Sequence, residues 1–282
     1  MTRSFKRGRP GASSAVLYES SRSRAFGAHF RVAAIAVCLL AGREARAVDP
    51  FEIQVYDASI DPPMTAAIEL HVNAVVSGLE TVPPPELPPN HQTHLTAEPS
   101  FGLTPWWEVG AYVQSTIRGD GGLDFAGVKL RSKLAAPPVA GSPFRGAVNF
   151  ELSRLPAAYD PARWGVEVRP IATASLAGGR LYFGLNPILD WDLAGTDASG
   201  RPALEPAATG LYVLEDLLSL GFEYYANFGP IGRWLPAGAQ EHYLYEVINV
   251  YRWKRWEINF GVGEGLTEAS NRLVVKAILG FH

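Results

Sequence analysis

Cysteine and long apolar runs are what this 282-residue chain most clearly lacks. Its one cysteine is Cys38, so the rest of the chain has no disulfide and no cysteine-based metal site. A lipoprotein anchor at that position would need a small preceding residue, and Val37 is not small. No stretch approaches the roughly eighteen consecutive apolar residues of a transmembrane helix. The sequence therefore predicts neither a disulfide-held domain nor a helical membrane protein.

The first 47 residues differ in charge from the rest. They hold nine Lys or Arg and only two acids, Glu19 and Glu44. The apolar run Val32–Ala41 follows a basic lead and is too short to cross a bilayer as a helix. Ala45-Arg46-Ala47 is a small-x-small site of the kind that signal peptidase accepts. We expect residues 1–47 to be a cleaved signal peptide, the alternative being a disordered basic tail with a buried helix.

Basic charge is scarce once this leader is set aside. The whole chain has 25 basic and 28 acidic residues, and residues 48–282 retain 16 and 26, a net charge of −10. A nucleic-acid binder needs a basic surface that releases phosphate counterions. The charge balance therefore excludes nucleic acid as a partner.

Residues from about 66 to 282 form short segments in which apolar and polar side chains alternate. In the first, Ala67–Ser77, the two faces are Ile68, Leu70, Val72, Ala74 and Val76 against Glu69, His71 and Asn73. Period two is the period of a β-strand with one apolar face. We count twelve such segments, within a range of ten to fourteen, and each is long enough to cross the hydrocarbon layer as a tilted strand. The less regular ones are about 92–101, 165–176, 204–214 and 242–252.

The connectors indicate which face meets lipid. Those after odd-numbered segments tend to be long, such as 78–91 and 192–203, and those after even-numbered segments tend to be short, such as 177–178 and 215–217. An outer-membrane barrel has this asymmetry because its two rims face different compartments. Aromatic residues of the kind that sit at headgroup depth gather at the short-turn rim: Phe101, Trp106, Trp107, Phe144, Tyr251, Trp253, Trp256 and Phe281.

These features predict an all-β fold, a closed antiparallel transmembrane β-barrel over residues 66–282, rather than a soluble sandwich. The expected location is the outer membrane of a Gram-negative bacterium, and the expected partners are membrane lipid, lipopolysaccharide and the barrel-insertion machinery. Barrels of this kind often end in an aromatic residue, and here Phe281 is followed by His282. Residues 48–65 form an N-terminal extension. Within it Phe51–Asp57 alternates like a short strand, as either a periplasmic extension or a lumen-lining piece.

The polar faces of the segments supply the candidate functional residues. Lys129, Arg131 and Lys133 form a basic ladder along one strand, and Arg145, Asn149 and Glu151 lie on the next. The other candidates for the lumen lining are Glu69, His71, Glu108, Glu167, Arg169, Glu223, Glu246, Glu257 and Lys276. Opposite charges on these faces either neutralise each other and plug the lumen or line a narrow aqueous path and set its ion preference.

Other chemistry is poorly supported by the sequence. His91 and His94 with Glu98 lack a third ligand at metal-site spacing. Gly261–Gly265 lacks the Lys-Ser/Thr and helix of a phosphate loop. No G-x-S-x-G elbow exists, and neither His71 nor His242 has a nearby serine marked as a nucleophile. We therefore expect no catalytic residues, no metal and no cofactor, although Ser–His pairing across strands stays open.

Six stretches carry a resemblance to a known class. They are Phe51–Asp57, Leu103–Gln114, Phe125–Lys133, Trp164–Ile171, Phe222–Gly232 and Asn271–Phe281. In these the chain resembles uncharacterised Gram-negative outer-membrane barrel proteins, similar to putative transporters associated with phenol and hydrocarbon degradation. The resemblance implies a transmembrane barrel and transport, and it identifies no functional residues.

Three hypotheses follow for the function. The first is a channel or passive transporter for a small molecule, which the resemblance suggests could be apolar. The second is a structural or adhesive barrel with a plugged lumen that binds through its long loops. The third is a lipid-directed hydrolase.

Overall fold

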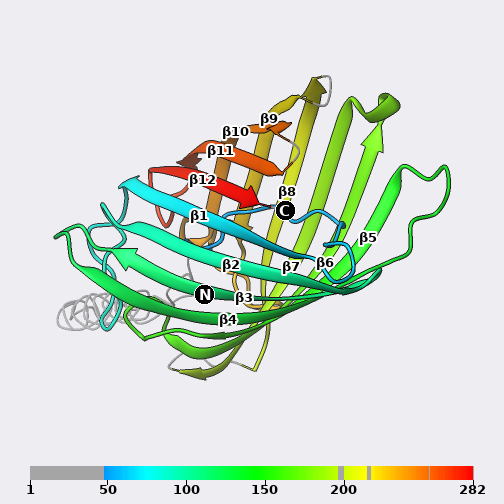
Figure 1. Ribbon diagram of the computed structural model, residues 1–282. Helices are drawn as coiled ribbons and strands as arrows, with labels where there is room; N and C mark the ends of the chain where they lie inside the picture. The colour runs from blue at the N-terminus through cyan, green and yellow to red at the C-terminus, as the bar shows by residue number, and fades with distance from the viewer. Residues whose placement is uncertain (1–47, 196–199, 215–216, 254, 282) are drawn as a thin grey trace, which may run out of the picture. The chain divides into compact units, whose positions relative to one another are not determined.

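The strands close into a single barrel. In the computed structural model, which describes residues 48–195, 200–214, 217–253 and 255–281, twelve antiparallel strands pair in sequence order and β12 returns to β1 (Figure 1). The strands are β1 Ala66–Ser77, β2 Thr93–Thr104, β3 Trp107–Ile117, β4 Leu123–Ala135, β5 Phe144–Arg154, β6 Ala162–Leu176, β7 Leu181–Gly195, β8 Ala203–Leu214, β9 Leu218–Asn227, β10 Glu241–Trp253, β11 Trp256–Gly265 and β12 Leu273–Phe281. The prediction of a closed barrel of twelve strands is confirmed.

The ladders leave no free sheet edge. His71 in β1 pairs with Ile278 in β12 on one side and with Thr96 in β2 on the other. The described residues contain two 3-10 turns, η1 Ala177–Gly179 and η2 Ala237–Ala239, and no helix among them is long and apolar enough to span a bilayer.

The barrel is apolar outside and polar inside. In β1, Leu70 and Val72 are 43% and 42% exposed, whereas His71 and Asn73, which alternate with them, are each 1% exposed. The same alternation recurs around the barrel, with Leu130, Phe150, Leu185 and Phe222 outside and Lys129, Glu151, Asn186 and Glu223 inside. Water-soluble barrels have the opposite polarity, so this barrel has the outer surface of a membrane-spanning one.

Aromatic side chains mark one rim of that outer surface. Trp106, Phe144, Trp256 and Phe281 lie at the short-turn ends of their strands and are substantially exposed. Trp256 and Phe281 contact each other at a tilt, with ring centroids 5.0 Å apart across β11 and β12. Rings at this level have both water and hydrocarbon within reach, as expected at a membrane interface.

Two sequence expectations need correction. Phe51–Asp57 forms no strand, because it runs inside the barrel and its backbone bonds wall side chains such as Asn186. Glu246 does not share the polar face, since it is exposed between the buried Tyr245 and Val247 in β10. Glu246 therefore points outward, in register with Phe222 and Val262 on the neighbouring strands.

β4 departs from regular geometry where the ladder with β3 shifts between Gln114 and Ser115. Gly127, opposite that shift, has φ +134°, which a residue with a Cβ rarely adopts. An added Cβ there would lie 2.7 Å from the carbonyl oxygen of Arg154 in β5. Glycine therefore allows both the bulge and the close approach of the two strands.

Candidate functional site

The chain before β1 passes through the barrel from one rim to the other. At the loop rim the backbone N–H of Val48 donates to Glu241 Oε2 at 2.9 Å, where β10 begins. At the short-turn rim the N–H of Asp61 donates to Glu108 Oε2 at 2.5 Å, near the start of β3. We call residues 48–63 the luminal segment; it is the blue trace inside the barrel in Figure 1.

Wall side chains take the place of a strand partner for the luminal segment. The carbonyls of Pro50, Phe51 and Ile53 accept hydrogen bonds from Asn73 Nδ2, Thr96 Oγ1 and Lys276 Nζ, each at 2.9 Å. The amide of Asn186 bonds both the N–H and the carbonyl of Tyr56, at 2.7 and 3.0 Å. These backbone groups thus have hydrogen-bond partners although the segment does not join the sheet.

The basic ladder of β4 meets the acids of the luminal segment. Lys129 Nζ pairs with Asp49, with Glu52 at 3.3 Å and with Glu151 of β5 at 3.3 Å. Lys133 Nζ lies 3.7 Å from Asp57. Arg131 instead pairs with two wall carboxylates, Glu98 at 2.7 Å and Glu108 at 2.6 Å. Two of the three rungs therefore hold the segment, and the middle rung ties β2, β3 and β4 together.

Glu52 is the centre of the charge network. It is 4% exposed, and Arg169 Nη1 lies 3.1 Å from its Oε1 while Lys129 approaches its Oε2. Arg169 also bonds Glu167 at 2.7 Å. A buried carboxylate between two cations is compensated, and removing both cations would leave it as an expensive unpaired charge.

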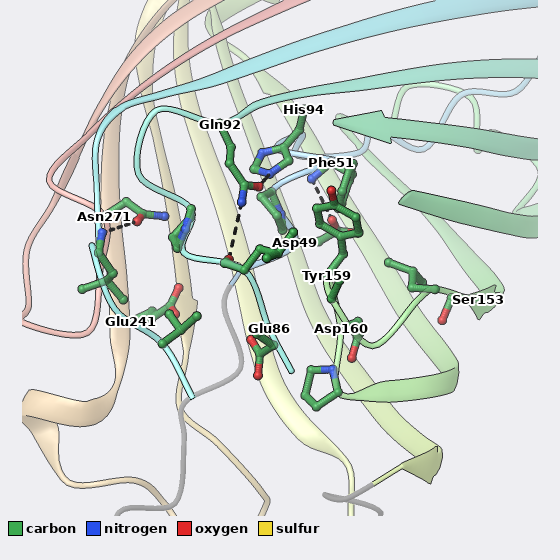
Figure 2. Close-up of a pocket in the computed structure, with 18 of the residues that line it drawn as sticks. Asp49, Phe51, Glu86, Gln92, His94, Ser153, Tyr159, Asp160, Glu241 and Asn271 are labelled. Atoms are coloured by element: carbon green, nitrogen blue, oxygen red, sulfur yellow. Dashed lines mark hydrogen bonds between the residues drawn. The ribbon is translucent and has the colours of Figure 1, made fainter. Parts of the chain in front are cut away.

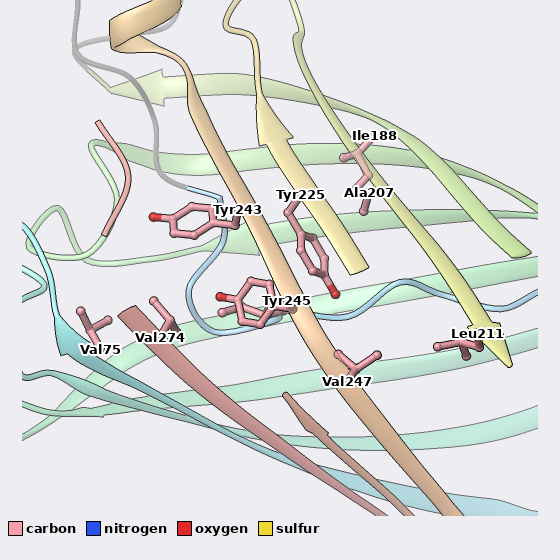
Figure 3. Close-up of a cluster of buried hydrophobic side chains, with 10 residues drawn as sticks. Val75, Ile188, Ala207, Leu211, Tyr225, Tyr243, Tyr245, Val247 and Val274 are labelled. Carbon is pink, nitrogen blue, oxygen red and sulfur yellow. The ribbon is translucent and has the colours of Figure 1, made fainter. Parts of the chain in front are cut away.

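Tyrosines pack beside these charges. The guanidinium of Arg169 lies 4.2 Å from the ring centroid of Tyr56, a cation–π contact. The Tyr56 hydroxyl bonds the Tyr112 hydroxyl, which in turn donates to Glu151 Oε1 at 3.1 Å. Beyond them, Lys276 pairs with Glu223 and lies among the rings of Tyr225 and Tyr245. Figure 3 shows Tyr225 and Tyr245 together with Tyr243 in a cluster of buried hydrophobic side chains, with the luminal segment running past it.

His71 lies between two acids, with Nε2 3.2 Å from Glu98 and 3.5 Å from Glu69. The ligand atoms of Glu69, His71 and Glu98 lie within 4.8 Å of one another, which is close enough to surround a cation. However, Arg131 already neutralises Glu98, and Gln54 Nε2 donates to Glu69 Oε2 at 3.1 Å. The cluster is thus satisfied as a polar contact between wall and segment. His91 and His94 do not join it, since His91 is exposed and His94 bonds Gln92.

The luminal segment leaves a cavity at each end of the lumen. The one at the loop rim measures about 150 Å³ and is lined by Asp49, Phe51, Lys129, Tyr159 and Glu241, with Glu86, Glu167, Asp190 and Glu205 adding acidic groups (Figure 2). The one at the short-turn rim measures about 660 Å³ and is lined by Asp57, Asp61, Arg131, Lys133, Glu223 and Glu257. Both linings are charged, which suits a hydrated polar solute.

Two long loops meet over the smaller cavity. The N–H of Leu87 in the 78–92 loop donates to the carbonyl of Ala158 in the 155–161 loop at 2.9 Å. Tyr159 stacks edge-on against Phe51 of the luminal segment, with centroids 6.0 Å apart, and donates to Asp124 Oδ2 at 2.7 Å. Burial and the bond to the Asp124 carboxylate raise the pKa of Tyr159, so the phenol stays protonated. The loops therefore close over the start of the segment.

The residues proposed from sequence do not all reach the network. Glu69, His71, Glu108, Lys129, Arg131, Glu151, Arg169, Glu223 and Lys276 take part in the contacts above, and Lys133 pairs only with Asp57 among the described ion pairs. Arg145 and Glu257 lie exposed at the short-turn rim, and Glu257 borders the larger cavity. The sequence did not single out Asp49, Glu52, Tyr56 or Tyr112. The only signal for the first two was that acids recur in residues 48–65, which the sequence left as either a periplasmic extension or a lumen-lining piece.

Comparison with known proteins supports the fold. No family model matches this chain. No curated protein matches it. Among solved structures, the COG4313 outer membrane channel from Pseudomonas putida F1 matches with TM-score 0.55 and 12% identity over 82% of this chain and 99% of that one. A KdgM porin matches at 0.51 with 10% identity over 77% and 98%, and a NanC porin at 0.50 with 10% identity over 77% and 100%. At these identities, the likeness establishes a barrel of outer-membrane type.

Proposed function

We propose that the protein is an outer-membrane channel for a small polar solute and that the luminal segment holds it closed. The observation that carries the proposal is how the segment is held. Side chains of the barrel wall donate hydrogen bonds to its carbonyl groups, and its backbone does not pair with a strand of the sheet. Side-chain contacts can be exchanged for water one by one, whereas a strand leaving a sheet would open the barrel wall.

Carboxylates of the wall can neutralise the luminal cations when the segment leaves. Four of the cations described above have a wall carboxylate besides any partner on the segment: Lys129 has Glu151, Arg131 has Glu98, Arg169 has Glu167 and Lys276 has Glu223. Departure of Asp49 and Glu52 therefore leaves no bare cation among these four. A segment that never leaves the lumen would not need these wall carboxylates. A segment that can leave needs them, because they keep the buried cations paired.

Polarity decides the class of solute. Each cavity is bordered by carboxylates, and the basic ladder extends from one cavity to the other, with Lys129 in the smaller and Lys133 in the larger. An apolar solute would have to displace water from these charged groups. It forms no hydrogen bonds or ion pairs that would offset the free energy of their desolvation. The proposed cargo is thus small and polar, in contrast to the apolar cargo that the resemblance to hydrocarbon-associated transporters would suggest.

Single-channel recording in planar bilayers tests the proposal. Wild type is expected to be mostly closed, and a Glu52→Gln, Asp57→Asn variant to open more often, because two anchors of the segment are weakened. Asp120→Asn is the matched control, since it removes a carboxylate that pairs with Arg118 in an exposed hairpin. A closed trace for the double variant, with the barrel folded, would favour the structural or adhesive barrel with a plugged lumen.

A lipid hydrolase is less well supported. In the described structure the His242 ring nitrogens bond Tyr224 Oη at 2.7 Å and Gln240 Oε1 at 3.1 Å, and His71 bonds two acids. Neither ring is aimed at a serine hydroxyl, which a Ser–His hydrolase requires. Lipid turnover by the purified protein with outer-membrane lipids would reinstate this alternative.

A further inference from the structure

Glu241 is a buried carboxylate that bonds the first residue of the luminal segment. It is 3% exposed, and its Oε2 accepts the hydrogen bond from Val48 N at 2.9 Å. In the described part of the chain, no lysine, arginine or histidine forms an ion pair with it. The acids around Glu52 each have a cation within ion-pair distance, and a buried carboxyl group without one is unusual.

The surroundings of Glu241 make a positive partner more necessary. The cavity that it borders also has Asp49, Glu86, Glu167, Asp190 and Glu205 in its lining. The one lysine there, Lys129, is engaged with Asp49, Glu52 and Glu151. An amide N–H offers Glu241 one hydrogen bond and no charge. A cation at the position of Val48 N would offer both.

Packing fixes Val48 at that position. Its side chain rests against the cluster that includes Tyr243, Val75 and Val274. Directly after it, Asp49 Oδ1 accepts the N–H of Phe51 at 2.8 Å, which forms a tight turn, and Lys129 holds the same carboxylate. Contacts made by Val48 and Asp49 therefore orient the nitrogen of Val48 toward Glu241.

The sequence supplies the missing charge. Ala45-Arg46-Ala47 ends the proposed leader, and cleavage after Ala47 would turn the Val48 amide into an α-ammonium group. We propose that Glu241 is the binding site for this ammonium group, so that removal of the leader creates the ion pair that secures the luminal segment at the loop rim. The ligand is a primary ammonium group, and it is the processed terminus of the chain itself.

The proposal rests on leader removal and makes no use of solute transport. An amide would bond Glu241 equally well in any chain that continues upstream of Val48. Only a chain that begins at Val48 has its α-ammonium group next to Glu241. A chain longer by two residues has an uncharged amide there. Maturation and closure of the lumen would then be one event.

Protection of the α-amine is the direct test. The protein is purified from outer membranes, its intact mass is measured, and folded and denatured samples are treated with an amine-acylating reagent before peptide mass spectrometry. We expect a chain that starts at Val48, whose α-amine reacts at least tenfold more slowly when folded, about the effect of one buried ion pair. A different first residue, or equal reactivity in folded and denatured protein, would overturn the assignment.

Variants separate the ion pair from simple burial. Glu241→Gln is expected to make the α-amine reactive in the folded barrel, and Glu205→Gln, which alters a carboxylate of the same cavity bonded by Asn227, is expected to leave it protected. If Glu241→Gln prevents folding, the glycine insertion described next distinguishes the ion pair from simple burial.

An insertion tests the charge itself. Two glycines placed between Ala47 and Val48 keep an amide at Val48 and move the ammonium group away. A thiol at Ala58→Cys, a buried position in a mature chain without other cysteines, then reports release of the segment through its labelling rate. Faster labelling in the insertion variant supports the proposal, and an unchanged rate contradicts it. Conductance enters none of these three tests, so failure here leaves the channel proposal standing.

Discussion

Arg169 Nη1 lies 3.1 Å from Glu52 Oε1 in the middle of the barrel. One residue belongs to the wall and the other to a segment outside the sheet, and each has a further partner of opposite charge. The lumen therefore holds a charged segment set among paired charges, which differs from a lumen filled by apolar side chains. That difference makes closure sensitive to single substitutions.

Substitution of Glu52 should loosen the luminal segment. Glu52→Gln removes the charge that pairs with Arg169 and Lys129, while Glu167 and Glu151 still neutralise those cations. We expect labelling of an Ala58→Cys thiol to accelerate by about tenfold or more, since charge-assisted contacts contribute roughly 1.5–3 kcal/mol. Asp120→Asn should leave the rate unchanged, and equal rates in both variants would show that Glu52 does not hold the segment.

A charge on the outer surface should destabilise the barrel in a depth-dependent way. Leu130 is 60% exposed near the middle of β4, so Leu130→Arg should lower the free energy of unfolding in bilayers by roughly 2–4 kcal/mol. Val139, 70% exposed in the connector after β4, should accept arginine with little change. Urea unfolding in lipid vesicles measures both. A neutral Leu130→Arg would argue against lipid at this face.

Gly127 should not tolerate a side chain. Gly127→Ala places a Cβ at φ +134° and 2.7 Å from the Arg154 carbonyl, so we expect a loss of about 1–3 kcal/mol in unfolding free energy. Gly146 is the matched control in β5, because a Cβ there would meet its nearest neighbour, the Ile171 carbonyl, at an ordinary 3.7 Å. The temperature at which the folded band on a gel converts to the unfolded one compares the two. Similar temperatures would mean that the bulge relaxes freely.

Reversing one rung of the ladder should change ion preference once the lumen is open. Lys133 borders the larger cavity and pairs with Asp57 of the luminal segment. In the Glu52→Gln, Asp57→Asn background, Lys133→Glu should shift the reversal potential in a salt gradient toward cation selectivity. Arg118→Glu, in the exposed hairpin between β3 and β4, serves as the control. No shift for Lys133→Glu would place the conducting path elsewhere.

The sequence carried more information about the wall than about the lumen. Alternation along β1 and β4 predicted both the strands and their outward faces, because side chains of a strand alternate between two faces. The same reasoning failed for Phe51–Asp57, which alternates equally well but joins no strand of the sheet. It failed also for Glu246, where a carboxylate suggested the polar face and the parity of β10 places it outside.

The sequence by itself determined the twelve strands, their polarity and the two unlike rims, since these follow from local periodicity, strand length and connector length. Only the tertiary structure decided that residues 48–63 lie in the lumen and that Asp49 and Glu52 meet the basic ladder. The physical reason is distance along the chain. Lys276 bonds the carbonyl of Ile53 across 223 positions, and such contacts exist only after closure of β12 on β1 has formed an interior.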